Sequence, residues 1–460
     1  MATSAQTVQD HPSNPKEEQG KVKQLYSAIW RWHFYAGIIF APFIVMLSIT
    51  GAIYLFKTQI ENWMYQDFYY IQAGQQKVQP SAQLAEVKKA YPKGTITSYQ
   101  PSFEANRTSQ VGVQNSKQSF TVFVNPYDGK IVGQLNDEDR LMGKIEKLHG
   151  ELMVGTVGDR LVELAACWAI ILLITGIYLW WPRERKALYG ILIPRLSKGK
   201  RLFWRDMHAV TAFWLSAFVA LLIITGLPWS GLMGDMINRV ATATHTGYPP
   251  FLWGAKPEST IPTKDVAKVA WAAEQLPVPS SSSGIQPISV EQVMKITEEK
   301  KVYPGYNINF PEGEKGVYTV SVYPDQPENQ ATIHIDQYSG KVLADLRFKD
   351  YGPLAKVISI GIALHEGHYF GFFNQILGLV TCLGLIAVAG SGLVMWWKRR
   401  PQGKLGAPSL PKNFKMMRWV AIIIIALGVL FPLVGVSLII ALLLDFLVVR
   451  KIPKVKQWVG

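Results

Sequence analysis

Four histidines occur at matching positions of an internal repeat, and they are the residues of this chain best suited to chemistry. The spacing from His33 to Gly51 is identical to the spacing from His208 to Gly226. Both histidines come just before or within apolar stretches of about 20 residues, the length that a helix needs to cross a bilayer. Because an ionisable side chain at a membrane helix is energetically costly, its recurrence indicates a function rather than a packing role.

A second pair of histidines repeats with a longer spacing. The distance along the chain from His149 to Gly176 is the same as that from His365 to Gly392. Both segments then end in Trp-Trp beside basic residues. A unit made of one helix, a long polar segment and a second helix therefore occurs twice in the same orientation, as in membrane proteins with parallel repeats.

The basic residues predict how the chain is oriented in a membrane. Four short segments, 1–32, 182–207, 398–418 and 450–456, hold 23 of the 47 Lys and Arg residues, and alternating spans place all four on one side. The positive-inside rule makes that side cytoplasmic. Topology thus accounts for the net charge of +14, and we expect a lipid bilayer rather than nucleic acid as the partner. Residues 1–20 lack an apolar signal core, so we expect the first span to be retained.

The expected fold class is a membrane α-helical bundle. Four core helices form a tandem parallel repeat, followed by a C-terminal transmembrane hairpin, with a single long tilted helix as the alternative for 419–449. Each of the two long outside segments reads as a small α+β domain, with strands joined by turns at Gly129 and Gly340. The predicted bounds are a cytoplasmic tail (1–24), a first span (25–57), an outside domain (58–145), a second span (146–182), a cytoplasmic loop (183–203), a third span (204–230), a second outside domain (231–360), a fourth span (361–398), a cytoplasmic loop (399–417), the hairpin (418–449) and a cytoplasmic tail (450–460).

This topology sorts the histidines into an inner pair, His33 and His208, and an outer pair, His149 and His365. Two imidazoles facing a common axis suit the two axial positions of a haem iron, whereas zinc and di-iron sites need three or four ligands. We therefore predict two haem b groups, one on each pair. Ligation by two imidazoles leaves no open iron position and favours electron transfer. Eighteen helical residues rise about 27 Å, so the two haems would lie near opposite membrane faces.

The outer pair raises two local questions. Residues 365–368 read H-E-G-H, which lacks the H-E-x-x-H spacing of a zinc protease. His368 has no counterpart in the first repeat, and His368, Glu366 and Tyr369 are candidate substrate contacts beside the outer haem. His149 lies well before the solid apolar run that starts at 161, so either the helix bends at 155–160 or the outer haem lies high above the bilayer.

These motifs resemble the PepSY-associated transmembrane family over roughly 25–400. The resemblance rests on W-H-x-x-x-G at His33, L-H-G and L-H-E at His149 and His365, the Trp-Trp ends and the Y-x-G-K turns. It implies PepSY domains in the periplasm, carried by a four-helix unit of the bacterial inner (cytoplasmic) membrane, with both termini in the cytoplasm. Some family members are described as iron-regulated inner-membrane proteins and reduce ferric siderophores with two haems. The resemblance therefore implies a haem-dependent oxidoreductase of iron acquisition, acting on a ferric siderophore or other ferric chelate.

The electron donor and the activity stay open at this stage. The sequence has no glycine-rich dinucleotide fingerprint, so we expect the donor, a quinol, a flavin or a reductase, to come from outside the chain. One alternative is a non-enzymatic regulator whose PepSY domains bind a periplasmic peptidase by strand addition. Another is a transporter of ferric chelates, since transporters also contain parallel repeats.

Overall fold

The structure is a computed structural model that describes residues 15–116, 118–182, 190–247, 261–284, 286–408 and 418–459. Most of the predicted tail 1–24, and parts of the predicted loops 183–203 and 399–417, lie outside the described residues. The chain divides into two compact units. The first unit comprises the described residues of Met1–Met46, Leu164–Ala220 and Gly384–Gly460, and the second comprises those of Leu47–Glu163 and Leu221–Leu383.

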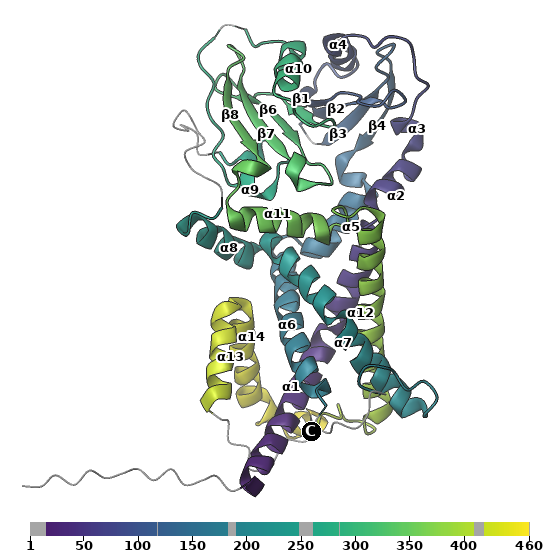
Figure 1. Ribbon diagram of the computed structural model, residues 1–460, viewed down its shortest axis with the longest axis vertical. Coiled ribbons are helices and arrows are strands. Elements are labelled where there is room, and N and C mark those ends of the chain that lie inside the picture. The colour runs from purple at the N-terminus through teal and green to yellow at the C-terminus, as the bar shows by residue number, and fades with distance from the viewer. Residues whose placement is uncertain are drawn as a thin grey trace, which may run out of the picture. The chain divides into compact units, whose positions relative to one another are not determined.

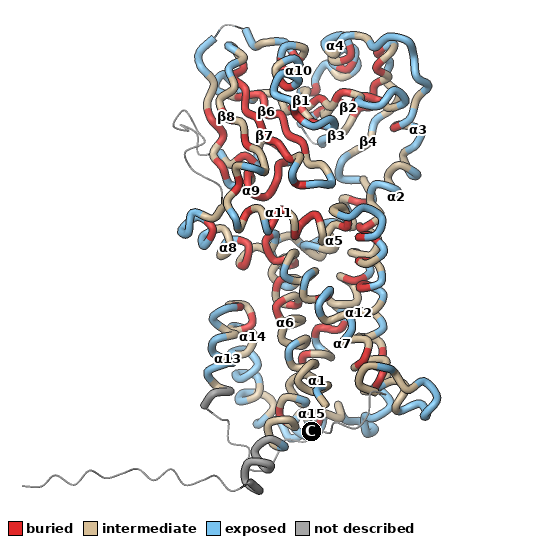
Figure 2. Tube along the Cα trace, in the orientation of Figure 1, coloured by how far each residue is buried: buried red, intermediate tan, exposed pale blue. Residues whose placement is uncertain are grey.

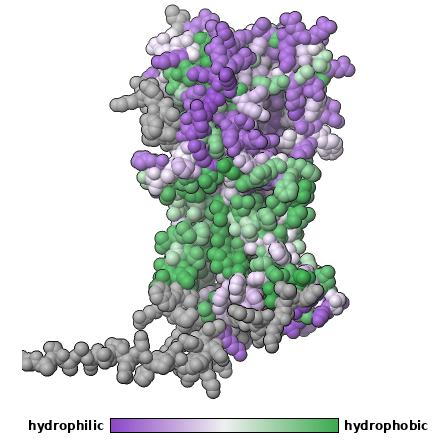
Figure 3. Space-filling view, viewed as in Figure 1, coloured by the Kyte–Doolittle hydropathy of each residue, from purple (hydrophilic) through white to green (hydrophobic). Residues whose placement is uncertain are grey.

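Within the described residues, five helical segments are long and apolar enough to cross a membrane. Such segments span bilayers because a helix satisfies its own backbone hydrogen bonds where water is absent. Hydrophobic side chains gather over the long helices in Figure 3, and hydrophilic ones over the sheet. The helices concerned are α1 (Pro15–Tyr54), α6 (Thr156–Trp180), α7 (Lys200–Gly226, continued by the 3₁₀ turn Leu227–Trp229), α12 (Phe372–Arg399) and α14 (Pro432–Leu444, continued by the π-helical turn Asp445–Val449).

The C-terminal apolar stretch folds back on itself rather than forming one long helix. Helix α13 (Arg418–Leu430) ends at Phe431 and packs against α14 (Figure 1). The two backbones meet at Gly428 and Gly435, where a Cβ on Gly435 would lie 2.7 Å from the carbonyl oxygen of Gly428. With 13 residues, α13 rises about 20 Å, less than the roughly 30 Å of a hydrocarbon core.

None of the four repeat histidines is the first residue of a long helix. Helix α1 begins at Pro15 and α7 at Lys200, so His33 and His208 both lie inside their helices. His149 and His365 lie at the C-terminal ends of two separate short helices, α5 (Leu141–Glu151) and α11 (Pro353–His365). The predicted spans 146–182 and 361–398 are therefore each interrupted, and their long helices start only at Thr156 and Phe372.

Left-handed backbone conformations explain both interruptions. Leu152, Met153 and Gly155 have positive φ between α5 and α6, and Gly367 and Gly371 have positive φ between α11 and α12. A residue in this conformation cannot continue a right-handed helix and commonly ends one. The chain therefore bends shortly after His149, at 152–155, and the helix that carries His149 does not run straight to the apolar run at 161.

A single antiparallel sheet of eight strands lies in the second unit, in the order β4-β3-β2-β1-β5-β6-β7-β8. The predicted outside domains, 58–145 and 231–360, each contribute four consecutive strands of this order, and the pairing of β1 with β5 joins them into one sheet. The strands are β1 (Thr95–Gln100), β2 (Ser109–Gln114), β3 (Ser119–Val124), β4 (Ile131–Asn136), β5 (Asn307–Asn309), β6 (Val317–Val322), β7 (Ala331–Asp336) and β8 (Val342–Arg347).

The two faces of this sheet differ in chemistry because side chains alternate along each strand. One face carries a buried apolar core under α4 (Pro80–Ala90) and α10 (Val290–Glu299), seen in red in Figure 2, with Tyr99, Val122 and Ile308 among its fully buried members. The opposite face carries uncharged polar side chains over five strands. They are Ser98, Gln100, Gln110, Thr121, Asn307 and Ser321.

Short elements complete the second unit. They are α2 (Lys57–Met64), α3 (Gln66–Tyr69), α8 (Gly231–Ala243), α9 (Trp271–Glu274) and the 3₁₀ turns Asp137–Asp139, Thr263–Asp265, Pro327–Asn329 and Phe348–Asp350. The first unit also contains α15 (Pro453–Val459).

The join between β1 and β5 can be tested by a disulfide. Ser98 and Asn309 lie directly opposite each other, beside the hydrogen bond from Phe310 N to Thr97 O. Such non-hydrogen-bonded pairs have Cα atoms about 4.5 Å apart, which lies at the short end of the disulfide range of about 4.4–6.8 Å. We expect the double variant Ser98→Cys/Asn309→Cys to form an intramolecular disulfide under mild oxidation, detected as a cross-linked peptide by mass spectrometry.

The pair Ser98→Cys/Ser321→Cys serves as the control, since two strand spacings of about 4.8 Å separate its strands and no link should form. Equal cross-linking of both pairs, or of neither, would contradict the order of the sheet.

Candidate metal centres and the adjacent cavity

The inner pair lies inside the first unit. The ring centroids of His33 on α1 and His208 on α7 are 6.3 Å apart, with planes at 85°. Nδ1 of His33 is 2.9 Å from Oγ1 of Thr175 on α6, and Nδ1 of His208 donates to the carbonyl of Val388 on α12 at 2.8 Å. Each ring is therefore held by a helix of its own half of the repeat and faces the ring of the other half.

The outer pair lies inside the second unit and repeats this arrangement. The ring centroids of His149 and His365 are also 6.3 Å apart, with planes at 75°. Nδ1 of His149 is 2.8 Å from Oγ1 of Thr50 on α1, and Nδ1 of His365 is 3.1 Å from Oγ1 of Thr225 on α7. The predicted sorting into two pairs thus corresponds to two ring pairs of equal separation.

The partners of Nδ1 determine which nitrogen of each ring carries the hydrogen. Each of the three threonines donates its own hydroxyl hydrogen to a carbonyl of its own helix, so its oxygen accepts from Nδ1–H. A carbonyl, as at Val388, can only accept. All four imidazoles are therefore Nδ1–H tautomers, and Nε2 keeps the lone pair that a metal needs. The threonine bonds run from Thr50 to Leu47 O (3.2 Å), from Thr175 to Ile171 O (2.7 Å) and from Thr225 to Leu221 O (2.7 Å).

A glycine lies against each ring and leaves room for it. These are the glycines that mark the repeat spacing in the sequence. A side chain at any of them would press on an imidazole. The ideal Cβ would lie 3.4 Å from the ring of His149 at Gly51, 3.3 Å from His33 at Gly176, 3.1 Å from His365 at Gly226 and 3.3 Å from His208 at Gly392.

The spacing of these glycines is visible in the sequence, but the role of the threonines was not predicted from it. A signal was present, because Ile-Thr-Gly occurs at 49–51, 174–176 and 224–226. The fourth copy reads Gly-Ser-Gly at 390–392, and Ser391 donates to the carbonyl of Val388 at 2.9 Å. The serine thus bonds the same carbonyl that holds His208, and the backbone takes over the role of the missing threonine.

The centroid separation of both pairs is close to that expected for two imidazoles on one metal ion. A metal–imidazole bond is about 2.0–2.1 Å and a ring centroid lies about 1.1 Å beyond its nitrogen, so two coaxial rings on one ion have centroids about 6.3 Å apart. No group of three or more His, Cys, Asp or Glu side chains in the described part of the chain is placed to hold a metal ion. Each pair thus offers two imidazoles and no third ligand among the described residues, and two imidazoles are one of the ligand sets that hold haem iron.

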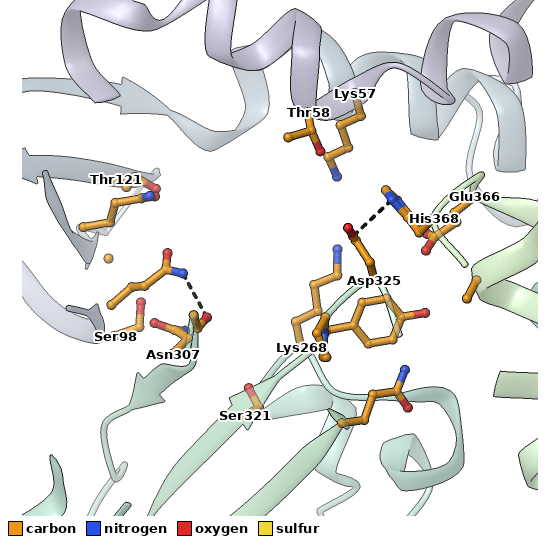
Figure 4. A pocket seen from close by; sticks show the side chains of 18 of the residues that line it. Lys57, Thr58, Ser98, Thr121, Lys268, Asn307, Ser321, Asp325, Glu366 and His368 are labelled. Atoms are coloured by element: carbon orange, nitrogen blue, oxygen red, sulfur yellow. Dashed lines mark hydrogen bonds and ion pairs between the residues drawn. The ribbon is translucent and has the colours of Figure 1, made fainter. Parts of the chain in front are cut away.

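A cavity of about 460 Å³ lies in the second unit, between the polar face of the sheet and the ends of α1 and α11 (Figure 4). This volume lies in the range of small-molecule sites, roughly 300–1,000 Å³. Ala363 and Glu366, on either side of His365 in the chain, line its wall. A ligand in the cavity would thus lie beside the segment that carries one of the outer histidines.

Two of the three candidate substrate contacts line this cavity. Glu366 does so, and so does His368, whose Nδ1 is 3.3 Å from Oδ1 of Asp325. Tyr369 is not among the lining residues, and its hydroxyl donates to Glu328 at 3.0 Å. The structure therefore places His368 at the cavity beside Asp325, whereas the hydroxyl of Tyr369 bonds Glu328.

The lysines of the cavity were missed because they come from segments that are far apart in the sequence. Lys57 from α2 and Lys268 from the segment before α9 point into the same space (Figure 4). Burial lowers the pKa of Lys57, and so does the charge of Lys268. Burial raises the pKa of Glu366. No local pattern in the sequence marks Lys57 and Lys268 as neighbours.

The helices and the two histidine pairs define a multi-pass membrane protein with an α+β portion. Comparison with known families places it more closely: residues 30–399 match the family described as the PepSY-associated TM region, and the chain belongs to this family. No curated protein matches the chain.

The close contact between a glycine and each imidazole ring can be tested by two substitutions on one helix, one of which is the control. If each histidine pair holds one haem, Gly392→Val should displace His208 and lower bound haem from about two to about one per chain, since one ligand is lost. Gly390→Val on the same helix should leave haem content unchanged, because nothing lies within 4 Å of its Cβ. Haem per polypeptide is measured as the pyridine haemochrome. Equal losses of haem in both variants would contradict the role of Gly392 in leaving room for the ring of His208.

Proposed function

We propose that this protein is a di-haem b electron carrier that reduces a ferric siderophore or other ferric chelate in the periplasm. It would be an oxidoreductase of the bacterial inner membrane, with both termini in the cytoplasm as the basic segments predict. The observation that supports it best is the pair of tautomer-locked imidazole sets, each with centroids 6.3 Å apart and no third protein ligand in the described chain.

When bound, haem supplies one-electron transfer between the ferric and ferrous states. His33 and His208 would hold one haem and His149 and His365 the other, and two protein ligands on each iron would leave no open site for oxygen or water. The Nδ1–H bonds to Thr175, Thr50, Thr225 and the Val388 carbonyl fix ring orientation and raise ligand basicity. Little has to reorganise in such a site when an electron arrives or leaves.

The direction of transfer follows from the proposed topology. The inner pair would receive electrons from a quinol, a flavin or a reductase, since the chain has no dinucleotide fingerprint of its own. The outer pair would pass one electron to ferric iron held in the cavity beside Glu366. Ferrous iron binds such chelators more weakly than ferric iron, so the metal would then dissociate.

An optical spectrum with histidine variants tests the core of this proposal. Purified protein with sufficient haem supply should show a reduced b-type spectrum and about two haems per chain. Replacing His33 or His208 by Ala should remove one haem, and replacing His149 or His365 should remove the other. His368→Ala should keep both. A protein without haem, and with variants that stay functional, would favour the regulator of a periplasmic peptidase instead.

The threonine bonds predict a change in reduction potential. Thr225→Val removes the acceptor of Nδ1–H on His365 without changing the shape of the side chain. A less basic imidazole stabilises the ferric state less, so the midpoint potential of one haem should rise while haem content stays the same. Spectroelectrochemical titration measures this potential, and Thr121→Val, on the sheet, is the control. An unchanged potential would contradict the role of Thr225.

A further inference from the structure

We propose that the cavity beside the outer pair binds an anionic, oxygen-rich ligand of the polycarboxylate class, with Lys268 and Lys57 binding its carboxylates. This inference rests on the proposed function in one respect, namely that the ligand carries ferric iron. The binding itself needs no electron transfer, and it is therefore testable separately.

The sheet wall of the cavity favours a ligand with many oxygen atoms. Hydroxyls and amides of five strands, including Ser98, Gln110, Thr121 and Asn307, line this wall, and none of the lining residues on these strands is charged or aromatic. Such groups donate and accept hydrogen bonds without favouring one charge. A ligand with an apolar or aromatic surface would leave them unpaired, at a loss of binding free energy for each buried group.

The charged side chains on the wall opposite the sheet indicate which charge a ligand of the cavity should carry. Lys57 and Lys268 project into the cavity, and Asp325 is already paired with His368 at 3.3 Å. Glu366 is the other acidic side chain among the lining residues. Of these two lysines only Lys268 has no acidic side chain within 4.0 Å of its amine among the described residues, so an anionic group of a ligand can pair with it.

Lys268 is better suited than Lys57 to a test of anion binding, because its amine has fewer partners within the protein. The amine of Lys57 already lies 4.0 Å from Glu146 and donates to the hydroxyl of Tyr54 at 3.1 Å. Lys268 is exposed, and no acidic side chain lies within 4.0 Å of its amine among the described residues. Its charge is available to a ligand, and its replacement does not uncover a buried group.

Isothermal titration of the full haem-loaded chain with gallium(III) citrate tests the inference. Gallium(III) has the charge and size of ferric iron but accepts no electron, so binding is measured without reduction. Saturable binding is expected, and Lys268→Gln should weaken it about tenfold, the effect of one charge-assisted hydrogen bond. Lys89→Gln is the matched control, since Lys89 on α4 is exposed on the other face of the sheet.

A cationic gallium trihydroxamate complex is the second probe and should bind about tenfold more weakly than the citrate complex. Tighter binding of the cation, or equal citrate affinity in Lys268→Gln and the parent chain, would overturn the inference. An unchanged haem spectrum in Lys268→Gln shows that the chain is folded.

The two proposals fail in different ways. If gallium citrate binds but reduced protein does not transfer electrons to ferric citrate, the proposed reductase activity fails while the binding site stands. If ferric chelates are reduced but gallium citrate does not bind in the cavity, the binding site fails while the reductase stands.

Discussion

The hydrogen bond from Nδ1–H of each repeat histidine is the interaction on which the rest of the structure depends. It binds one helix of a repeat to the other, it selects the tautomer, and it holds the ring 6.3 Å from the ring of the other repeat. A hydroxyl in a helix is suited to this task because its hydrogen already bonds a carbonyl one turn earlier, as Thr175 and Thr225 show. The glycine that follows each threonine allows the ring to approach closely, since a Cβ at that position would lie only 3.1–3.4 Å from the imidazole.

The helix breaks follow from the same requirement in the second unit. His149 and His365 must reach threonines near the ends of α1 and α7, and both lie at the last turns of short helices that end in left-handed residues. The breaks free these short helices from the direction of α6 and α12. In the second repeat the segment after the break also carries Glu366 and His368 to the cavity, so the same bend that positions a ligand ring also builds part of the adjacent wall.

The sequence predicted the elements that repeat and missed the ones that depend on distant pairing. The histidines and their glycines were visible because their spacing recurs without gaps. Thr50 and Thr175 were not singled out, because a threonine inside an apolar helix is common and its partner is decided by packing. The break at Leu152 and Met153 carries no glycine signal at those two positions, although Gly155 follows. The β1–β5 pairing and the approach of Lys57 to Lys268 join residues from opposite halves of the chain, which no local pattern encodes.

The pairing of β1 with β5 relates the two repeats to each other as two subunits of a dimer are related. One repeat alone ends its four strands at β1, with an open edge of unpaired backbone groups, and the second repeat ends at β5 in the same way. Two copies of a single repeat meeting at these edges would restore the same strand order and would bring one histidine of each pair from each copy. The tandem chain is thus the covalent equivalent of a symmetric dimer. Each half alone has only four of the eight strands and one histidine of each pair, so neither half contains a complete pair.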